Sequence, residues 1–308
     1  MEKVRRFSRA KVIVNPIAGA GRTAKKWPQI MGLLKSIGLR FEYDVTEAPG
    51  HAIELAKSAA KKGYELVVSV GGDGTINEIV NGLYNAGKLR DVTLGIISTG
   101  AGADYIRTIG IHRHYKEACQ CLMNSRKLIV DLGVVEYVSN GEVSKRLFVN
   151  FAGLGFDAEV VKATTRRFKA LGSTPSYLMG LLTTFLFYKT KQVSLILDGQ
   201  PEERRVWTIL MSNGKYGGGG MLAAPNADPA DGLLDVVVID DLSKLDLLKS
   251  LPRIYKGTHL SHPKVTVKRA REIDIRPRQQ MSLQADGELL GEAPAHIYML
   301  PAALNVAI

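Results

Sequence analysis

The first part of the chain alternates short apolar runs with longer stretches in which apolar positions recur at helical spacing. The apolar runs lie at residues 11–15, 41–46, 66–71 and 93–97, and the amphipathic stretches follow at residues 27–38, 51–62, 75–85 and 104–110. This β-α-β-α rhythm is typical of a mainly parallel sheet with helices packed on it. The run Val67-Val68-Ser69-Val70 is apolar without alternation, as expected for a central strand covered on both faces.

The pattern of apolar residues changes after about residue 127, where short strand-like runs are separated by turn residues. These runs lie at residues 128–135, 146–151, 193–198, 206–212, 234–239, 264–267, 273–276, 281–284 and 296–300. They predict an antiparallel, β-rich second domain. With 308 residues the chain is long enough for two domains. We place an α/β domain at residues 1–126 and the β-rich domain at 127–308, with the last residues as candidates to pack back on the first domain.

The charge of the chain favours anionic partners. The formal net charge is +11, which suits nucleotides, nucleic acid or an anionic membrane. No nucleic-acid module or interleaved basic and aromatic pattern is present, so we predict no nucleic-acid partner.

Cys119 and Cys121 stand two apart on a predicted helix and face different ways, which disfavours a disulfide. The apolar run after the basic N-terminus is too short for a signal peptide, so we expect a cytoplasmic protein. A homodimer is left open.

One apolar stretch, residues 177–188, interrupts the β-rich part. Basic residues flank it on both sides: Arg166, Arg167, Lys169, Lys189 and Lys191. The stretch is shorter than the roughly 17–25 residues that cross a bilayer. Two interpretations remain open. The segment docks peripherally on an anionic membrane, which for a cytoplasmic protein is its inner face, or it is a buried helix between domains with solvated basic flanks.

Two predicted strands end in glycine-rich loops that precede helices. The first loop spans residues 15–22, and the second begins Gly71-Gly72-Asp73-Gly74-Thr75. Glycines let a backbone approach a phosphate closely, and the free N–H groups at a helix start supply donors. In the second loop, Asp73 offers a carboxylate for Mg²⁺ and Thr75 a hydroxyl for phosphate. The first loop is equally compatible with a structural turn.

Two further acidic segments are candidates for chemistry. Asp228-Pro229-Ala230-Asp231-Gly232 is a turn sequence whose two acids suit Mg²⁺ or Ca²⁺, although a plain turn has the same composition. Asp286-Gly287-Glu288 follows a strand-like run. If that strand continues, Asp286 and Glu288 share a face and one of them can accept a proton; an Asp-Gly hairpin turn is the alternative.

The segment Gly71-Gly72-Asp73-Gly74-Thr75-Ile76-Asn77-Glu78 resembles the signature of the diacylglycerol kinase catalytic domain, which sphingosine and ceramide kinases share and NAD kinases carry in shorter form. Further pieces resemble the bacterial soluble branch in order and spacing: Asn15-Pro16 with Gly19, Thr46, Asp131-Leu132-Gly133, Asn150 through Gly155-Phe156-Asp157, Ala224-Pro225 through Asp231-Gly232-Leu233-Leu234-Asp235, and Asp286-Gly287-Glu288. The resemblance covers nearly the whole chain.

The resemblance implies an ATP-dependent lipid kinase with a nucleotide domain, a β-sandwich-like lipid domain and an active site in the cleft between them. It implies ATP contacts from Asn15, Pro16, Ile17, Ala18, Gly19, Thr46, Gly71, Gly72, Asp73, Gly74, Thr75, Ile76, Asn77, Glu78, Gly100 and Ala101. It places Asp73, Asp104 and Asp131 around a catalytic Mg²⁺, and Asp228, Asp231 and Leu233 around a second, structural Mg²⁺ or Ca²⁺. Asp286 is the first candidate for the base and Glu288 the second.

The chain departs from the family at one loop. The family pattern Pro-x-Gly-Thr-x-Asn-Asp-Phe corresponds here to residues 98–105, and the Thr and Asn positions are Ala101 and Ala103. Loss of the hydroxyl at position 101 removes a phosphate hydrogen bond. Two alternatives stand beside the lipid kinase. The shared Gly-Gly-Asp-Gly-Thr loop leaves an NAD kinase-like enzyme, and Ala101 and Ala103 leave a catalytically weak relative that binds lipid or nucleotide. The sequence does not identify the lipid acceptor.

Overall fold

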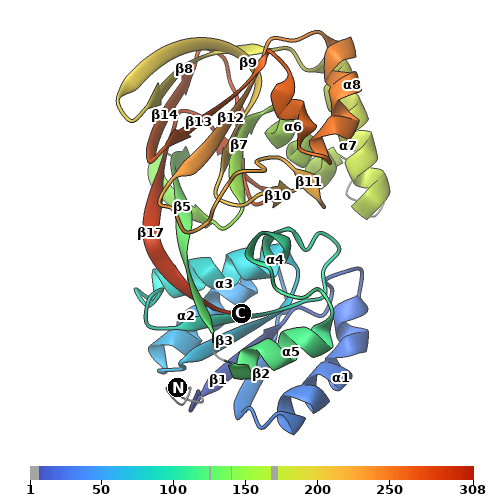
Figure 1. Cartoon of the computed structure of the whole chain (residues 1–308), viewed down its shortest axis with the longest axis vertical. Helices are drawn as coiled ribbons and strands as arrows, with labels where there is room; N and C mark the ends of the chain where they lie inside the picture. The colour runs from blue at the N-terminus through green and yellow to red at the C-terminus, as the bar shows by residue number, and fades with distance from the viewer. Residues whose placement is uncertain (1–6, 125, 140, 168–172) are drawn as a thin grey trace. The chain divides into compact units, whose positions relative to one another are not determined.

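The computed structural model describes residues 7–124, 126–139, 141–167 and 173–308 (Figure 1). The chain divides into two compact units. Unit 1 comprises Met1–Leu132 and Pro301–Ile308, and unit 2 comprises Gly133–Leu300. The long strand β17 (Ala295–Ala307) begins in unit 2 and ends in unit 1.

Unit 1 is a three-layer α/β fold (Figure 1). Its elements are β1 (Ala10–Val14), α1 (Arg22–Ser36), β2 (Phe41–Val45), α2 (His51–Lys61), β3 (Leu66–Gly71), α3 (Asp73–Asn85), β4 (Thr93–Ser98), α4 (Asp104–Ile109) and α5 (Tyr115–Asn124). The strands lie in the order β2-β1-β3-β4-β17, and all neighbours are parallel. Helix α2 packs against α3, and α1 packs against α5. The predicted α/β architecture is confirmed.

The strands of this sheet follow the apolar pattern of the sequence. Every residue of β1, β3 and β4 is buried, as a central parallel strand requires. The strand β2 lies at the edge of the sheet, and all of its residues are exposed or half-buried. Because parallel strands place their carboxyl ends at one edge, the loops that follow β1 to β4 all lie at that edge.

Unit 2 is built mainly from antiparallel strands. Its elements are most of β5 (Lys127–Ser139), β6 (Glu142–Phe148), β7 (Phe151–Gly155), α6 (Phe156–Lys162), a π-helical turn (Ala163–Arg167), α7 (Ser173–Phe187), β8 (Lys191–Leu197), β9 (Gln200–Ser212), β10 (Tyr216–Gly217), β11 (Met221–Leu222), β12 (Leu234–Asp240), α8 (Lys244–Ile254), a 3₁₀ turn (Thr258–Ser261), β13 (Val265–Ala270), β14 (Glu272–Pro277), β15 (Ser282–Ala285), β16 (Glu288–Glu292) and the first part of β17.

The strands of unit 2 follow the order β16-β15-β7-β9-β8-β14-β17, and β12 joins β9 to β13. The first half of β9 pairs with β8, and its second half lies between β7 and β12. A continuous apolar core fills the space between these strands, with members such as Phe148, Ile209 and Ile273. The predicted antiparallel, β-rich second domain is confirmed.

Unit 2 differs from the sequence-based prediction in several details. The run at residues 146–151 is not one strand, because β6 ends at Phe148 and β7 begins at Phe151. Strand β16 and helix α8 were not predicted. Helix α8 does carry a start signal: Ser243 accepts a hydrogen bond from the Asp246 N–H (3.1 Å), as an N-cap should.

Two further structural points bear on cysteine chemistry and membranes. Both cysteines are free, and burial raises the pKa of the Cys119 thiol to about 11, so this side chain stays protonated at neutral pH. Across the described ranges, no helix combines the length and the apolarity needed to traverse a bilayer.

Candidate active site

The loops at the carboxyl edge of the unit 1 sheet are joined by backbone hydrogen bonds. The Asn15 N–H donates to the Val70 carbonyl (2.9 Å), and the Thr99 N–H donates to the Gly71 carbonyl (2.8 Å). These bonds hold the loops after β1, β3 and β4 against one another. The structure therefore brings the two predicted glycine-rich loops together.

Glycine is required where these loops approach each other. A Cβ atom on Gly100 would lie 2.6 Å from the Gly72 Cα, and one on Gly71 would lie 2.4 Å from the Thr75 hydroxyl oxygen. Gly19 has a φ of +62°, and a Cβ there would lie 2.4 Å from the Thr99 carbonyl oxygen. Any side chain at these positions would clash with neighbouring atoms, which explains why glycine is present. Loops packed this closely can direct their backbone N–H groups at a phosphate.

Asn15 and Thr75 form the polar centre of these loops. The Asn15 Nδ2 donates to the Thr75 hydroxyl (3.0 Å). The Asn15 Oδ1 is buried and has no hydrogen-bond partner among the residues that the structure describes. Orphaned buried acceptors are uncommon in native proteins and are often satisfied by a bound molecule. This acceptor fits a donor group on a nucleotide.

Asp73 is the first residue of α3 and links the β3 loop to α4. Its carboxylate accepts hydrogen bonds from the N–H groups of Asp104 (3.3 Å) and Tyr105 (3.1 Å). The carboxylate passes so close to Gly102 that a Cβ there would lie 2.9 Å from the Asp73 Oδ2. The Asp104 carboxylate is paired with Arg107 at 2.9 Å. Asp73 is thus fixed at the loop edge by backbone donors.

The three carboxylates assigned to the catalytic Mg²⁺ are not gathered into one cluster. Asp131 is buried, and its carboxylate accepts a hydrogen bond from the Ala302 N–H (2.6 Å), which fastens the end of β17. The ligand atoms of Asp73, Asp104 and Asp131 do not form a group of three within 4.8 Å of one another. The Asp73 and Asp104 carboxylates do lie beside the same residue, since a Cβ atom on Gly102 would lie 2.9 Å from the Asp73 Oδ2 and 3.5 Å from the Asp104 Oδ2.

Several residues predicted to touch the nucleotide have structural partners. The Glu78 carboxylate accepts hydrogen bonds from Gly50 N–H (2.9 Å) and Ala52 N–H (3.1 Å), at the N-terminus of α2 where a negative charge is favourable. Asn77 is fully buried and accepts a bond from the Asn81 side chain (3.1 Å). The side chains of Glu78 and Asn77 therefore bond other parts of unit 1 and have a structural role.

The remaining predicted residues of the first loop form its turn. Pro16, Ile17 and Ala18 follow β1, and the Ala18 N–H donates to the Asn15 carbonyl (3.2 Å). Ile17 is 73% exposed, whereas Thr46 and Ile76 are buried. Sequence reasoning missed Thr23, whose hydroxyl lies 2.5 Å from the Thr99 hydroxyl and ties α1 to the β4 loop. A threonine at a helix start near a glycine loop is too common to have indicated this pair.

In unit 2, Asp286 and Gly287 form a two-residue turn between β15 and β16. Both have positive φ values, +47° and +82°, which is the geometry of a tight hairpin. The expectation that Asp286 and Glu288 share a face of one continuing strand is therefore wrong. The Asp-Gly pair ends the strand, because both residues tolerate the left-handed backbone that such turns require.

The Asp286 carboxylate binds the backbone between β6 and β7. It accepts hydrogen bonds from the N–H groups of Val149 (2.7 Å), Asn150 (3.0 Å) and Phe151 (3.1 Å). These bonds explain why the predicted strand at residues 146–151 breaks, since its N–H groups face a side chain at that point. Glu288 forms an ion pair with Arg146 at 2.5 Å.

The loop assigned to a second cation is a turn held by its own side chains. The Asp228 carboxylate accepts from Ala230 N–H (3.1 Å), and the Asp231 carboxylate accepts from Leu233 N–H (3.0 Å). The other oxygen of Asp231 is paired with the Arg269 guanidinium. Because Arg269 already supplies the positive charge, this donor set does not fit a divalent cation as it stands.

Comparisons with known proteins agree with this architecture. Residues 9–135 match the family model of the diacylglycerol kinase catalytic domain, and residues 150–308 match that of the YegS C-terminal NAD kinase beta sandwich-like domain. The chain is 31% identical over 312 residues to a diacylglycerol kinase of Mycobacterium tuberculosis strain H37Rv, with 99% of this chain and 97% of the relative covered. It is 26% identical over 303 residues to a diacylglycerol kinase of Bacillus subtilis strain 168, with 98% and 97% covered.

A solved structure is similar over the same length. The crystal structure of a putative diacylglycerol kinase from Bacillus anthracis strain Sterne has a TM-score of 0.81 and 27% identity, covering 99% of this chain and 97% of that one. These matches confirm the family resemblance and the β-sandwich-like second unit. They cover both units, and the relatives are named as kinases. The chain therefore belongs to the diacylglycerol kinase family.

Proposed function

We propose that this protein transfers the γ-phosphoryl group of ATP to a hydroxyl group of a membrane lipid, with diacylglycerol as the first candidate acceptor. The observation that carries the proposal is the loop at Gly71–Thr75, which meets the loops of β1 and β4 at the carboxyl edge of a parallel sheet. Family membership supports the reaction class.

The nucleotide half of the reaction is assigned to unit 1. Backbone N–H groups at the start of α3 would donate to the phosphates, and the Asn15 Oδ1 would accept from a hydroxyl or amino group of the nucleotide. Asp73 and Asp104 would hold Mg²⁺, which when bound neutralises charge on the phosphates. Asp131 is assigned a structural role, because its carboxylate already accepts a hydrogen bond from the Ala302 N–H of β17.

The base is assigned to unit 2. Asp286 stays the first candidate for accepting the proton of the lipid hydroxyl, and Glu288 the second. The three N–H groups on Asp286 fix its carboxylate in position, which suits a group that must meet a substrate hydroxyl at hydrogen-bond distance. Glu288 is held instead by Arg146.

A lipid acceptor requires contact with a membrane, and α7 and α8 offer a surface for it. Leu181 and Phe185 pack on an aromatic core, so the opposite side of α7 faces outward. Helix α8 lies beside α7, because the Lys244 ammonium bonds the Leu186 carbonyl (Figure 1). We define the apolar surface as the exposed side chains Leu178, Leu182, Leu186, Phe187, Leu245 and Leu248.

Basic residues beside the apolar surface favour an anionic membrane as its partner. Lys189, Lys244 and Lys249 are exposed next to it, and each basic residue near an anionic bilayer contributes about 1 kcal/mol. Exposed side chains on α7 favour docking over the alternative of a helix buried between domains. Of the basic flank, Lys169 lies outside the described residues.

The apolar surface yields a vesicle-binding prediction. Replacing both Leu186 and Phe187 with Ser should lower partitioning onto anionic vesicles about tenfold or more, because each buried side chain contributes at least about 1 kcal/mol. Flotation at rising salt measures both contributions. Val143→Ser is the matched control, since Val143 is 69% exposed on β6 away from these helices. Equal partitioning of the double variant and the wild type would exclude this surface.

The departure at residues 98–105 yields a nucleotide-binding prediction. Ala101 is exposed, and Arg113 holds its carbonyl (3.2 Å), so a Thr side chain has room there. Ala101→Thr should restore a phosphate hydrogen bond and lower the dissociation constant of Mg-ATP about five- to thirtyfold, a gain of about 1–2 kcal/mol. Ala103 has a φ of +58°, which suits Asn, but it is 1% exposed. We expect Ala103→Asn to weaken the binding of Mg-ATP, because the larger side chain has no space at this buried position. Calorimetric titration with Mg-ATP measures the dissociation constants of both variants and of the wild type.

The function is tested by a kinase assay on mixed vesicles. Purified protein with Mg-ATP is offered diacylglycerol, a polyprenol, a sphingoid base or phosphatidylglycerol in vesicles, and NAD in a separate reaction, and the products are separated by mass. A phosphorylated lipid supports the proposal and names the acceptor. Phosphorylation of NAD instead would favour the NAD kinase-like alternative. Binding of ATP and vesicles without any product would favour the catalytically weak relative.

A further inference from the structure

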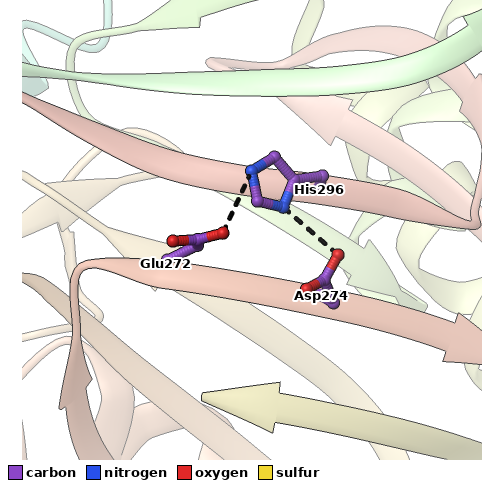
Figure 2. A group of neighbouring side chains, drawn as sticks. All are labelled: Glu272, Asp274 and His296. Atoms are coloured by element: carbon purple, nitrogen blue, oxygen red, sulfur yellow. Dashed lines mark hydrogen bonds and ion pairs between the residues drawn. The ribbon is translucent and has the colours of Figure 1, made fainter. Parts of the chain in front are cut away.

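Three side chains with metal-binding atoms meet on the outer face of unit 2 (Figure 2). His296 projects from β17 between Glu272 and Asp274 of β14. Its Nδ1 lies 3.2 Å from the Asp274 Oδ1, and its Nε2 lies 3.7 Å from the Glu272 Oε1. Each residue offers one ligand atom, and the three atoms lie within 4.8 Å of one another. No step of the proposed phosphoryl transfer uses this cluster.

The strand register explains the convergence. Asp274 lies directly opposite His296 in the antiparallel pair of β14 and β17, and Glu272 precedes Asp274 by two residues. Residues two apart on a strand share a face, and opposite residues on neighbouring strands have Cβ atoms about 4.5–5.5 Å apart. Two ligands from one strand and one from its neighbour therefore surround a single point above the sheet.

The backbone under the cluster is held in place. Strand β14 is paired on both sides, with β8 and with β17. The alternate residues Ile273, Ile275 and Ile297 are fully buried in the core. The cluster itself stays open to solvent, because the side chains of Glu272, Asp274 and His296 are 63%, 35% and 31% exposed. A cation can reach it without any change in the fold.

We propose that Glu272, Asp274 and His296 bind a Zn²⁺ ion. An imidazole nitrogen with two carboxylate oxygens is a donor set that Zn²⁺ accepts, at bonds of about 2.0–2.2 Å, whereas Mg²⁺ and Ca²⁺ prefer oxygen alone. Rotation of the two acidic side chains brings their oxygens around one ring nitrogen. Water completes the tetrahedron.

Within the described residues, neither Glu272 nor Asp274 forms an ion pair with a lysine or arginine. Another acid close to His296, Glu136, is paired with Lys145 and with the Tyr298 hydroxyl (3.0 Å). With a neutral imidazole, the two carboxylates of the cluster face each other across His296 without a basic partner in these contacts. A dication relieves this repulsion. The competing account is a protonated His296 shared between two carboxylates, which predicts no zinc binding.

Zinc affinity of the full chain distinguishes these accounts. The tag-free protein is titrated with Zn²⁺ in competition with a chromophoric chelator, in excess Mg²⁺ so that oxygen-only sites do not contribute. His296→Gln should lower zinc affinity about tenfold or more, since even an outer partner of a metal typically contributes that much. His114→Gln is the matched control. His114 also pairs with a carboxylate, Glu117 at 2.6 Å, but within the described part of the chain it belongs to no group of three possible metal ligands.

Stability measurements provide a second readout. Zn²⁺ should raise the melting temperature of the wild type and of His114→Gln, and leave that of His296→Gln unchanged. Glu272→Gln, a change at the most exposed ligand, repeats the test if His296→Gln folds poorly. Absence of zinc binding by the wild type would overturn the proposal. Equal affinity in the wild type, His296→Gln and Glu272→Gln would also overturn it, by placing the zinc elsewhere.

Discussion

Asp73→Asn is expected to lower the rate of lipid phosphorylation by about three orders of magnitude. Loss of one carboxylate at the proposed Mg²⁺ position removes several kcal/mol of charge stabilisation from the phosphates, and about 4 kcal/mol corresponds to a thousandfold. The two N–H groups of Asp104 and Tyr105 bond different oxygens of Asp73, so the Asn side chain keeps one of these two bonds to the start of α4. The measurement is kcat with Mg-ATP and the acceptor identified in the vesicle assay.

Two comparisons make this result specific. Asp91→Asn is the matched control, because Asp91 also lies in unit 1 but pairs with Lys88 at the surface (2.6 Å), and its activity should equal that of the wild type. Thermal melting shows whether Asp73→Asn is folded. If the folded variant kept more than about a tenth of the wild-type kcat, Asp73 would not hold the catalytic metal.

The parallel sheet of unit 1 could be predicted from the sequence because its strands are buried on both faces. Apolar runs such as residues 67–70 then have no alternation, and each amphipathic stretch between them marks a covering helix. The glycine-rich loops could be located because each follows such a strand and precedes a helix, although a structural turn has the same composition. The sequence could not show which loop residues point inward. Glu78 stands in the motif, but it caps α2.

Unit 2 was harder to predict because its turns depend on distant partners. The break between β6 and β7 is made by Asp286, more than 130 residues later in the chain. No local pattern at residues 146–151 contains that information. The zinc-ligand cluster has the same origin: Glu272 and Asp274 read as ordinary strand positions until the register places His296 opposite them.

Asp286→Asn is expected to affect both catalysis and stability. Its two carboxylate oxygens accept three N–H bonds, whereas an amide offers one oxygen and directs its own N–H₂ group at a donor. Loss of one charge-assisted bond should cost about 2 kcal/mol and lower the melting temperature by about 4–8 °C. If Asp286 is the base, kcat should also fall about 10²–10⁴-fold with little change in KM for ATP. Both quantities are measured well below the melting temperature, with kcat expressed per folded molecule.

Glu288→Gln separates the two roles of this turn. Glu288 lies two residues away and loses its ion pair with Arg146 in the variant, so it reports the cost of disturbing the hairpin without touching Asp286. We expect a small fall in melting temperature and a kcat close to that of the wild type. A normal kcat for folded Asp286→Asn would leave Asp286 as a support for the segment at Val149–Phe151 alone. If Glu288→Gln were then inactive, the proton would go to Glu288, and Arg146 would become the residue that positions the base.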